Sequence, residues 1–333
     1  MTLFRSFNKS LMAAGLAAAA VFAPVAAQAV EKMRVATVVW AGYGPFYVAD
    51  KLDLFKPHGL ELDLQFFNDP ALIPTAMASR SVDGGMLTYD QVVSSVARGL
   101  KHRVVMPIDF SNGGDAIVAD ASINSIEDFR GKKVGYNPLS PSDFLLAYAL
   151  QQNGMSKSDI AEINMTPEGI PGAMASGGLP VGVTYEPNVS QILSMGGGDK
   201  FKVVFSSSDA PGLITDVLVF DEAVIARKPE AIKAMMKGYL DGLQYMQDNP
   251  DKAAEIVGEV LGVSAEEAKE QMAGAYNIPL AEMGQSFVES ADTHSFYGSG
   301  AIIAKLLLDN GEIPRVPDFG ATYDAQFVNA LSE

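Results

Sequence analysis

Aromatic and acidic side chains stand where several predicted strands end, which is where open α/β sheets bind ligands. Trp40 and Tyr43 follow an apolar strand predicted over residues 34–39, and Pro45 then starts a helix at a position where its missing N–H loses no bond. Later strand ends add hydroxyl, amide and carboxyl groups. The complete candidate set is Trp40, Tyr43, Tyr89, Asp90, Asp109, Asn112, Ser140, Tyr185, Glu186 and Asp216. Because the set holds aromatic rings and carboxylates but no Lys or Arg, it predicts a site for a cationic or amine-bearing small molecule.

These candidates also have structural interpretations, which stay open at this point. A lone Trp40 could belong to the core, and Asp90 could stabilise the first turn of a helix through the helix dipole. Asp109 could cap the Gly-rich turn that follows it. Asp115 and Asp216 are expected to stabilise a hinge in preference to contacting a ligand. An anionic group of the ligand could sit on the helix N-terminus predicted at residues 140–143.

Other kinds of chemistry find little support in the sequence. The histidines His58, His102 and His294 are not spaced as metal ligands, and the H-E-x-x-H, calcium-loop and G-x-S-x-G motifs are absent. The glycines at 196–198 lack the Lys-Ser/Thr pair of a phosphate-binding loop. The chain has no cysteine, which excludes thiolate ligands and cysteine nucleophiles. We therefore expect no enzyme, no catalytic residue, no metal and no cofactor.

Strand and helix patterns alternate along the first two thirds of the chain. Strands are predicted over 60–67, 82–87, 102–109, 132–136, 162–165, 181–184 and 201–206, with helices between most of them. This order predicts an α/β protein with mostly parallel sheets flanked by helices. After residue 221 the patterns are helical, over 229–247, 250–261, 264–273 and 293–308, with no strong strand between them.

Two short strands preceded by Gly-containing loops, at 115–119 and 216–219, are expected to cross between domains as hinges. Residues 120–215 would then form one lobe. Residues 30–114 and 220–333 would form the other, which makes that lobe discontinuous in sequence. Each lobe has an ordinary size for a domain.

The first 29 residues have the pattern of a secretory signal peptide. Arg5 and Lys9 precede an apolar, Ala-rich run over 11–25, and Ala27-Gln28-Ala29 fits the small-x-small cleavage rule. The apolar run is shorter than the roughly 20 residues of a spanning helix. We therefore predict export to the periplasm with cleavage after Ala29.

The chain is acidic, with a formal net charge of −16, and loss of the basic leader would make it more negative. Such a surface repels nucleic acids and anionic lipids. A secreted chain without disulfides must rely on a large core, which 333 residues permit. We expect a freely diffusing monomer with no nucleic-acid partner.

Motifs along nearly the whole mature chain resemble those of one family. They are Trp40-x-Gly42-Tyr43-x-Pro45-x-Tyr47-x-Ala49, Leu54-Phe55-x-x-x-Gly59-Leu60, Asp109-x-Ser111-Asn112-Gly113-x-Asp115-x-Ile117-Val118, Gly131-Lys132-Lys133-Val134-Gly135, Tyr185-Glu186-Pro187 and Ser207-x-Asp209-x-Pro211-Gly212-Leu213-Ile214-x-Asp216. In this order they resemble the substrate-binding proteins of ABC importers for nitrate, taurine, aliphatic sulfonates and thiamine pyrimidines. The resemblance implies two α/β lobes joined by crossing strands, a ligand trapped between them, and delivery to an ABC permease in the inner membrane.

The resemblance also bears on the ligand. The family often has Trp before Glu-Pro, and Tyr185 keeps an aromatic wall there. The segment 109–115 resembles members that take amine, guanidine- or urea-related and taurine-like compounds. It implies a small nitrogen-containing cationic or zwitterionic solute, with a thiamine pyrimidine or a sulfonate as alternatives.

Two other functions remain as alternatives on the same fold. Thiamine-pyrimidine synthases and porphobilinogen deaminase need cysteines, so the cysteine-free sequence argues against both enzymes. A sensor that hands its ligand to a membrane kinase would have the same sequence features as a transport receptor.

Overall fold

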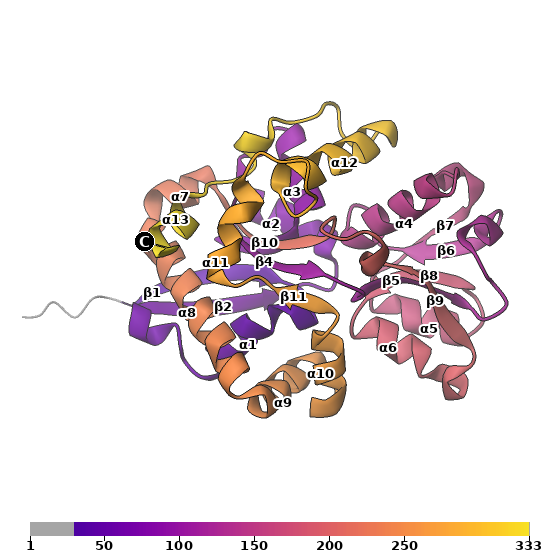
Figure 1. The fold of residues 1–333 in the computed structure, drawn as a ribbon, viewed down its shortest axis with the longest axis horizontal. Helices are drawn as coiled ribbons and strands as arrows, with labels where there is room; N and C mark the ends of the chain where they lie inside the picture. Colours follow the sequence, from indigo (N-terminus) through magenta and orange to yellow (C-terminus); the bar gives the residue numbers. More distant parts are fainter. Residues whose placement is uncertain (1–29, 333) are drawn as a thin grey trace, which may run out of the picture.

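The structure is a computed structural model that describes residues 30–332, and these form two α/β lobes, each built on one sheet (Figure 1). The two-lobed α/β prediction is therefore confirmed. The predicted signal peptide, residues 1–29, lies outside the described residues. Within residues 30–332, no helix combines the length and apolar character that a membrane span requires.

The larger lobe contains a six-stranded sheet with the order β11-β4-β10-β3-β1-β2. Its strands are β1 (Glu31–Thr37), β2 (Leu60–Phe66), β3 (Gly84–Thr88), β4 (His102–Ser111), β10 (Thr215–Asp221) and β11 (Ala275–Asn277). Strand β1 is parallel to β2 and β3, whereas β10 runs antiparallel to β3 and β4. The antiparallel β10 brings a strand from late in the chain into the centre of this sheet.

The smaller lobe contains a five-stranded sheet with the order β7-β6-β8-β5-β9. Its strands are β5 (Asp115–Asp120), β6 (Lys133–Tyr136), β7 (Ala161–Asn164), β8 (Val181–Tyr185) and β9 (Phe201–Ser206). Strand β6 is parallel to β7 and β8, and β5 is antiparallel to β8 and β9. Both sheets are therefore mixed, where the sequence predicted mostly parallel ones: β10 and β11 run antiparallel to the other strands of the large sheet, and β5 to those of the small sheet.

Helices cover both sheets, and proline or serine opens many of them. Pro lies in the first turn of α1, α2, α4, α8 and α9, and Ser264 forms a capping box at the start of α10. The helices are α1 (Gly44–Lys51), α2 (Ile73–Ala78), α3 (Tyr89–Ala97), α4 (Pro141–Gln152), α5 (Gly169–Ala175), α6 (Asn188–Leu193), α7 (Glu222–Arg227), α8 (Pro229–Asp248), α9 (Pro250–Leu261), α10 (Ala265–Met272), α11 (Leu280–Met283), α12 (Phe296–Asp309) and α13 (Gln326–Ser332).

Two segments carry the chain between the sheets. The first lies between the end of β4 at Ser111 and the start of β5, and the second between β9 and β10. The hydroxyl groups of Ser111 and Ser207 lie 2.8 Å apart, and the Gly113 N–H donates to Ser207 Oγ at 2.7 Å. The two crossings are therefore tied to each other. Each strand expected to act as a hinge belongs to a single sheet, and the chain crosses just before it.

A strand occurs after residue 221, where the sequence predicted helical patterns with no strong strand between them. Ala275–Asn277 form β11, which pairs antiparallel with β4 at the edge of the large sheet. Three residues are too few to produce an alternating pattern, so pairing with a preformed strand decides their conformation.

Helix α1, which follows the Trp40–Tyr43 loop, packs closely on α8. The contact depends on Gly242, because a Cβ there would lie 2.1 Å from the carbonyl oxygen of Pro45 and 3.1 Å from the Cβ of Ala49. The small residue lets the two helix backbones approach, and this approach positions the loop that precedes α1.

We expect Gly242→Ala to lower the free energy of unfolding by about 2 kcal/mol, because the helices must move apart. Equilibrium urea unfolding measures the loss. The control is Gly172→Ala in α5, where a Cβ would meet nothing within 4 Å, so helix propensity alone predicts a gain of up to about 1 kcal/mol. Equal changes in the two variants would contradict the close α1–α8 contact.

Candidate functional site

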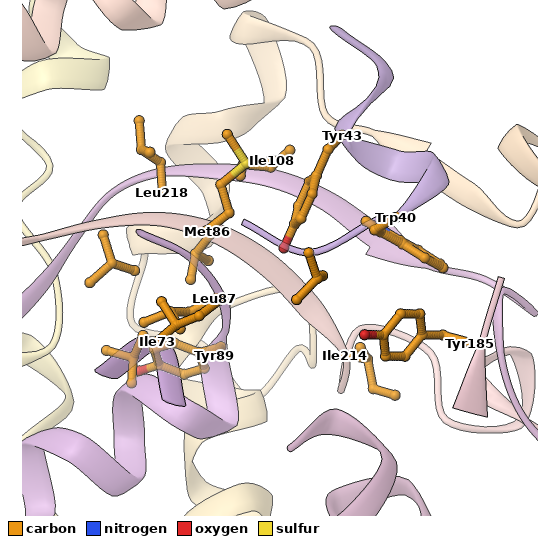
Figure 2. Close-up of a cluster of buried hydrophobic side chains, with 14 of the residues drawn as sticks. Trp40, Tyr43, Ile73, Met86, Leu87, Tyr89, Ile108, Tyr185, Ile214 and Leu218 are labelled. Carbon is orange, nitrogen blue, oxygen red and sulfur yellow. The ribbon is translucent and has the colours of Figure 1, made fainter. Parts of the chain in front are cut away.

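A cavity lies between the two lobes, at the ends of strands from both sheets. Counted together with the solvent space at its mouth, its volume is about 350 Å³. Figure 2 shows Trp40, Tyr43 and Tyr185 converging there, with Met86 and Leu87 close by. The lining residues are Val38, Trp40, Tyr43, Pro70, Met86, Leu87, Thr88, Gln91, Asp115, Pro141, Tyr185 and Asp216.

Trp40 joins the two lobes at this cavity. Its indole Nε1 donates to both carboxylate oxygens of Asp109, at 3.3 and 3.4 Å, and its ring meets Tyr185 edge-on with centroids 6.1 Å apart. The side chain is 3 % exposed, so Trp40 is both a core residue and a wall of the cavity.

Two glycines make room for this indole. A Cβ on Gly42 would lie 2.3 Å from the Trp40 Nε1 and 2.4 Å from an oxygen of Asp109. A Cβ on Gly114, in the first crossing segment, would lie 2.3 Å from the far end of the ring. The Trp40–Asp109 contact therefore requires the small-residue loop that the sequence places after the first strand.

Two carboxylates line the cavity, from Asp115 and Asp216, and the carboxylate of Asp109 lies buried behind the wall against Trp40. Asp109 and Asp216 face each other as register partners of β4 and β10, and the Tyr43 hydroxyl donates to Asp216. The exposed fractions are 0 % for Asp109 and 4 % for both Asp115 and Asp216. Neither Lys nor Arg occurs among the described residues that line the cavity, so these carboxylates have no cationic partner in its wall.

Burial without a cation disfavours the ionised form of each carboxyl group. Burial raises the pKa of Asp109 to about 8 and the pKa of Asp115 to about 7. Burial, and then the neighbouring Asp109 carboxyl, raise the pKa of Asp216 well above its usual value. Burial thus favours the protonated form of these groups, and a cation bound beside them would favour the ionised form.

Tyr185 contributes an unused hydrogen-bonding group. It is the register partner of Asp115 across β8 and β5, and its hydroxyl is buried with no hydrogen-bond partner among the described residues. A buried hydroxyl without a partner is unfavourable, so this group is available for a polar atom of a ligand.

Several predicted site residues have other contacts. The Tyr89 hydroxyl points into the large lobe and bonds the Phe296 carbonyl at 3.0 Å and the Thr322 hydroxyl at 2.8 Å. Glu186 accepts from the backbone and hydroxyl of Ser190 at 3.0 and 2.8 Å, within α6. These two side chains therefore stabilise their own lobes and lie outside the cavity wall.

Three further candidates lie near the cavity without lining it. Ser140 caps α4 by accepting the Ser142 N–H at 3.2 Å, and the Asn112 side chain is exposed. Asp90 is 4 % exposed and lines a separate recess with Gln91 and Asp143. Burial raises the pKa of Asp90 to about 6.

Sequence reasoning missed part of the cavity. Asp115 was expected to hold a hinge, yet it lines the cavity beside Tyr185. Thr88 and Gln91 form a capping box at the start of α3 and also line the wall. The capping-box motif could have located Thr88 at a strand end. The motif explains both residues by their role in α3, so it gives no reason to expect them in the cavity wall.

Metal binding finds no support in the described part of the chain, where no group of three or more His, Asp or Glu residues is arranged to hold an ion. The nitrogens of His58 and His294 lie 2.7 and 2.9 Å from Asp241 and Asp292, respectively. His102 is buried at the start of β4. The three histidines thus lie apart, on separate elements.

Comparison with known proteins agrees with this architecture. The family described as NMT1/THI5 like matches residues 40–253. The taurine-binding periplasmic protein of Escherichia coli K12 is 27% identical over 242 residues, which cover 71% of this chain and 72% of that protein. The alkanesulfonate-binding protein SsuA from Xanthomonas axonopodis pv. citri, bound to MOPS, superposes with a TM-score of 0.74 at 16% identity, covering 88% of this chain and 98% of that one.

The fold also occurs outside binding proteins. The desulfurization enzyme DSZB superposes with a TM-score of 0.63 at 12% identity, covering 90% of this chain and 98% of that one. At such identities the structural similarity shows the fold, and the function must be argued from the cavity itself.

The ligand-free protein should lose stability as the pH rises. The raised pKa values mean that the folded state keeps protons that the unfolded chain releases from about pH 4 upward. The free energy of unfolding therefore falls between about pH 4 and pH 8. Asp109→Asn cannot ionise, and we expect it to exceed the wild type by about 1 kcal/mol or more at pH 8 and by less at pH 5.

Urea unfolding at the two pH values measures this difference, with the exposed Asp199→Asn as the control. The same pH dependence in the wild type and Asp109→Asn would show that Asp109 is not protonated in the folded state.

Proposed function

This chain belongs to the NMT1/THI5-like family, and from that premise we propose that it is the periplasmic substrate-binding protein of an ABC importer. Its ligand is a small nitrogen-containing solute with a cationic group, captured between the two lobes and delivered to a permease of the inner membrane. The predicted signal peptide and the periplasmic relative in Escherichia coli support this location and role.

The three buried carboxylates without a cation carry the proposal. Removing a carboxylate from water is unfavourable unless a positive charge or several donors compensate it. The wall supplies the Trp40 N–H for Asp109 and the Tyr43 hydroxyl for Asp216. A ligand ammonium or guanidinium group would supply the missing positive charge and additional donors at the same point.

The remaining cavity wall suits the rest of a small amine. The Trp40 and Tyr185 rings offer aromatic surface to a cation, and the free hydroxyl of Tyr185 can bond a second polar atom. Val38, Met86 and Leu87 form an apolar side. The cavity therefore combines an acidic end with an apolar wall, as expected for a compact amine.

Two helices start at the cavity, and the acidic residues in their first turns disfavour an anionic ligand. Helix N-termini attract anions, but α3 and α4 already carry Asp90 and Asp143 in their first turns. These carboxylates place negative charge at the helix starts, which disfavours a sulfonate or nitrate there. A taurine-like zwitterion is the second candidate, because the Escherichia coli relative is named for taurine.

Binding without catalysis is the simpler function for this cavity. The described lining residues include no histidine, and the carboxylates lie beside aromatic and apolar side chains, which suits a wall that binds a cation. Because the cavity is enclosed by both lobes, a ligand must enter while the lobes are apart and be released when they separate again.

A two-carbon series separates charge from size. We expect 2-aminoethanol, a cation, to raise the melting temperature most, with taurine giving a smaller shift and 2-hydroxyethanesulfonate giving none. A thermal-shift assay at pH 7, with guanidinium chloride at millimolar concentration as a second cation, makes the comparison. Stabilisation by 2-hydroxyethanesulfonate alone would overturn the cationic ligand class.

The acidic residues at the two ends of β5 provide a matched pair of variants. We expect Asp115→Asn to weaken binding of 2-aminoethanol by about tenfold or more, because a charge-assisted hydrogen bond is lost inside the cavity. Asp120→Asn should bind as the wild type does, because Asp120 bonds Ser122 on the surface. Isothermal titration calorimetry measures both affinities, and equal effects would contradict the contact to Asp115.

A further inference from the structure

A single ion pair joins the lobes outside the cavity. Lys157, in the short 3-10 helix Lys157–Asp159 of the small lobe, lies with its Nζ 2.8 Å from Glu312 Oε1 of the large lobe. The Lys157 side chain is 20% exposed and that of Glu312 is 15% exposed. Among the ion pairs of residues 30–332, this one connects the two lobes, while the others stay within a lobe.

Each partner of this ion pair is also positioned by contacts within its own lobe. Lys157 also pairs with Asp143 at the start of α4 in its own lobe. On the other side, Arg98 Nη2 donates to the Glu312 backbone carbonyl at 2.7 Å, which fixes the chain just after α12. A charge pair between pre-positioned groups loses little side-chain freedom on forming, so it is stronger than an exposed pair of mobile side chains.

Hydrogen bonds connect this ion pair to the ligand cavity. The Leu139 N–H donates to Asp143 at 2.9 Å, and the Leu139 carbonyl accepts from Gln91 Nε2 of the large lobe at 3.3 Å. Gln91 lines the cavity. Leu139 has a φ of 62°, a left-handed conformation that is unfavourable for leucine. The loop is thus held in a strained form between the cavity wall and Lys157.

We infer that Lys157 is a latch that sets the affinity of the receptor from outside the cavity, by favouring the closed arrangement of the lobes. The inference rests on the proposed function, since it concerns closure around a ligand. The uncompensated carboxylates of the empty cavity oppose closure, and the latch favours it whether or not a ligand is present. Ligand binding and closure are one equilibrium, so a change at Lys157 alters the apparent affinity without touching the ligand.

Small-angle X-ray scattering of the ligand-free protein tests the latch directly. Lys157→Met should increase the radius of gyration, because the lobes separate more often. Lys202→Met is the control, since Lys202 bonds Asn124 Oδ1 at 2.8 Å within the small lobe, and it should match the wild type. An unchanged radius of gyration in Lys157→Met would overturn the inference.

A double-mutant cycle shows whether the effect comes from the ion pair. Glu312→Gln should open the lobes as Lys157→Met does, and the double variant should open them no further. Additive increases would mean that the two residues act separately, which contradicts a latch between them.

A ligand titration separates failure of the latch from failure of the proposed function. With 2-aminoethanol as the probe, Lys157→Met should bind about three- to tenfold more weakly than the wild type. If the wild type does not bind 2-aminoethanol, the proposed ligand class fails while the scattering result still decides the latch. If the wild type and Lys157→Met bind it equally, the latch does not set the affinity.

Discussion

The burial of three carboxylates without a cation is the constraint on which the rest of the site depends. Asp115 of β5 and Asp216 of β10 line the cavity, and Asp109 of β4 lies behind its wall as the register partner of Asp216. Closing the lobes removes these groups from water, which is unfavourable until a positive charge enters. The wall supplies only neutral hydrogen-bond donors, so the compensating positive charge must come from the ligand. The same property would give both affinity and selectivity for cations.

The chain crossings make this arrangement possible. Ser111, Gly113 and Ser207 hold the two connecting segments against each other, so the chain passes between the lobes twice at one place. Asp109 precedes the first crossing, Asp115 follows it, and Asp216 follows the second. A change in the angle between the lobes therefore changes the distance of Asp115 from Asp109 and Asp216, which are register partners in one sheet. The ionisation of Asp115 is thus coupled to closure.

The fold and part of the site could be predicted from local patterns. Alternating strands and helices indicated the two-lobed α/β fold, and the strand-end rule placed Trp40, Tyr43, Asp109, Tyr185 and Asp216 together. The rule does not say where a side chain points. Tyr89 begins a helix at a strand end, as expected, but its ring turns into the core toward Phe296. Asp115 was assigned to the hinge from the Gly-containing loop before its strand. Its position opposite Tyr185 depends on pairing between strands distant in sequence, and local patterns do not reveal such pairing.

Trp40 is the single tryptophan of the chain, and it lies in the cavity wall with its indole N–H bonded to Asp109 and its ring edge against Tyr185. Indole fluorescence responds to nearby charge and to water, and both change when a cation enters and the lobes close. The protein thus carries its one indole in the wall of the proposed binding cavity, with no second indole to dilute its signal. If the ligand binds in this cavity as proposed, the emission spectrum of Trp40 reports occupancy, and the natural ligand can be sought by optical titration of the unlabelled protein.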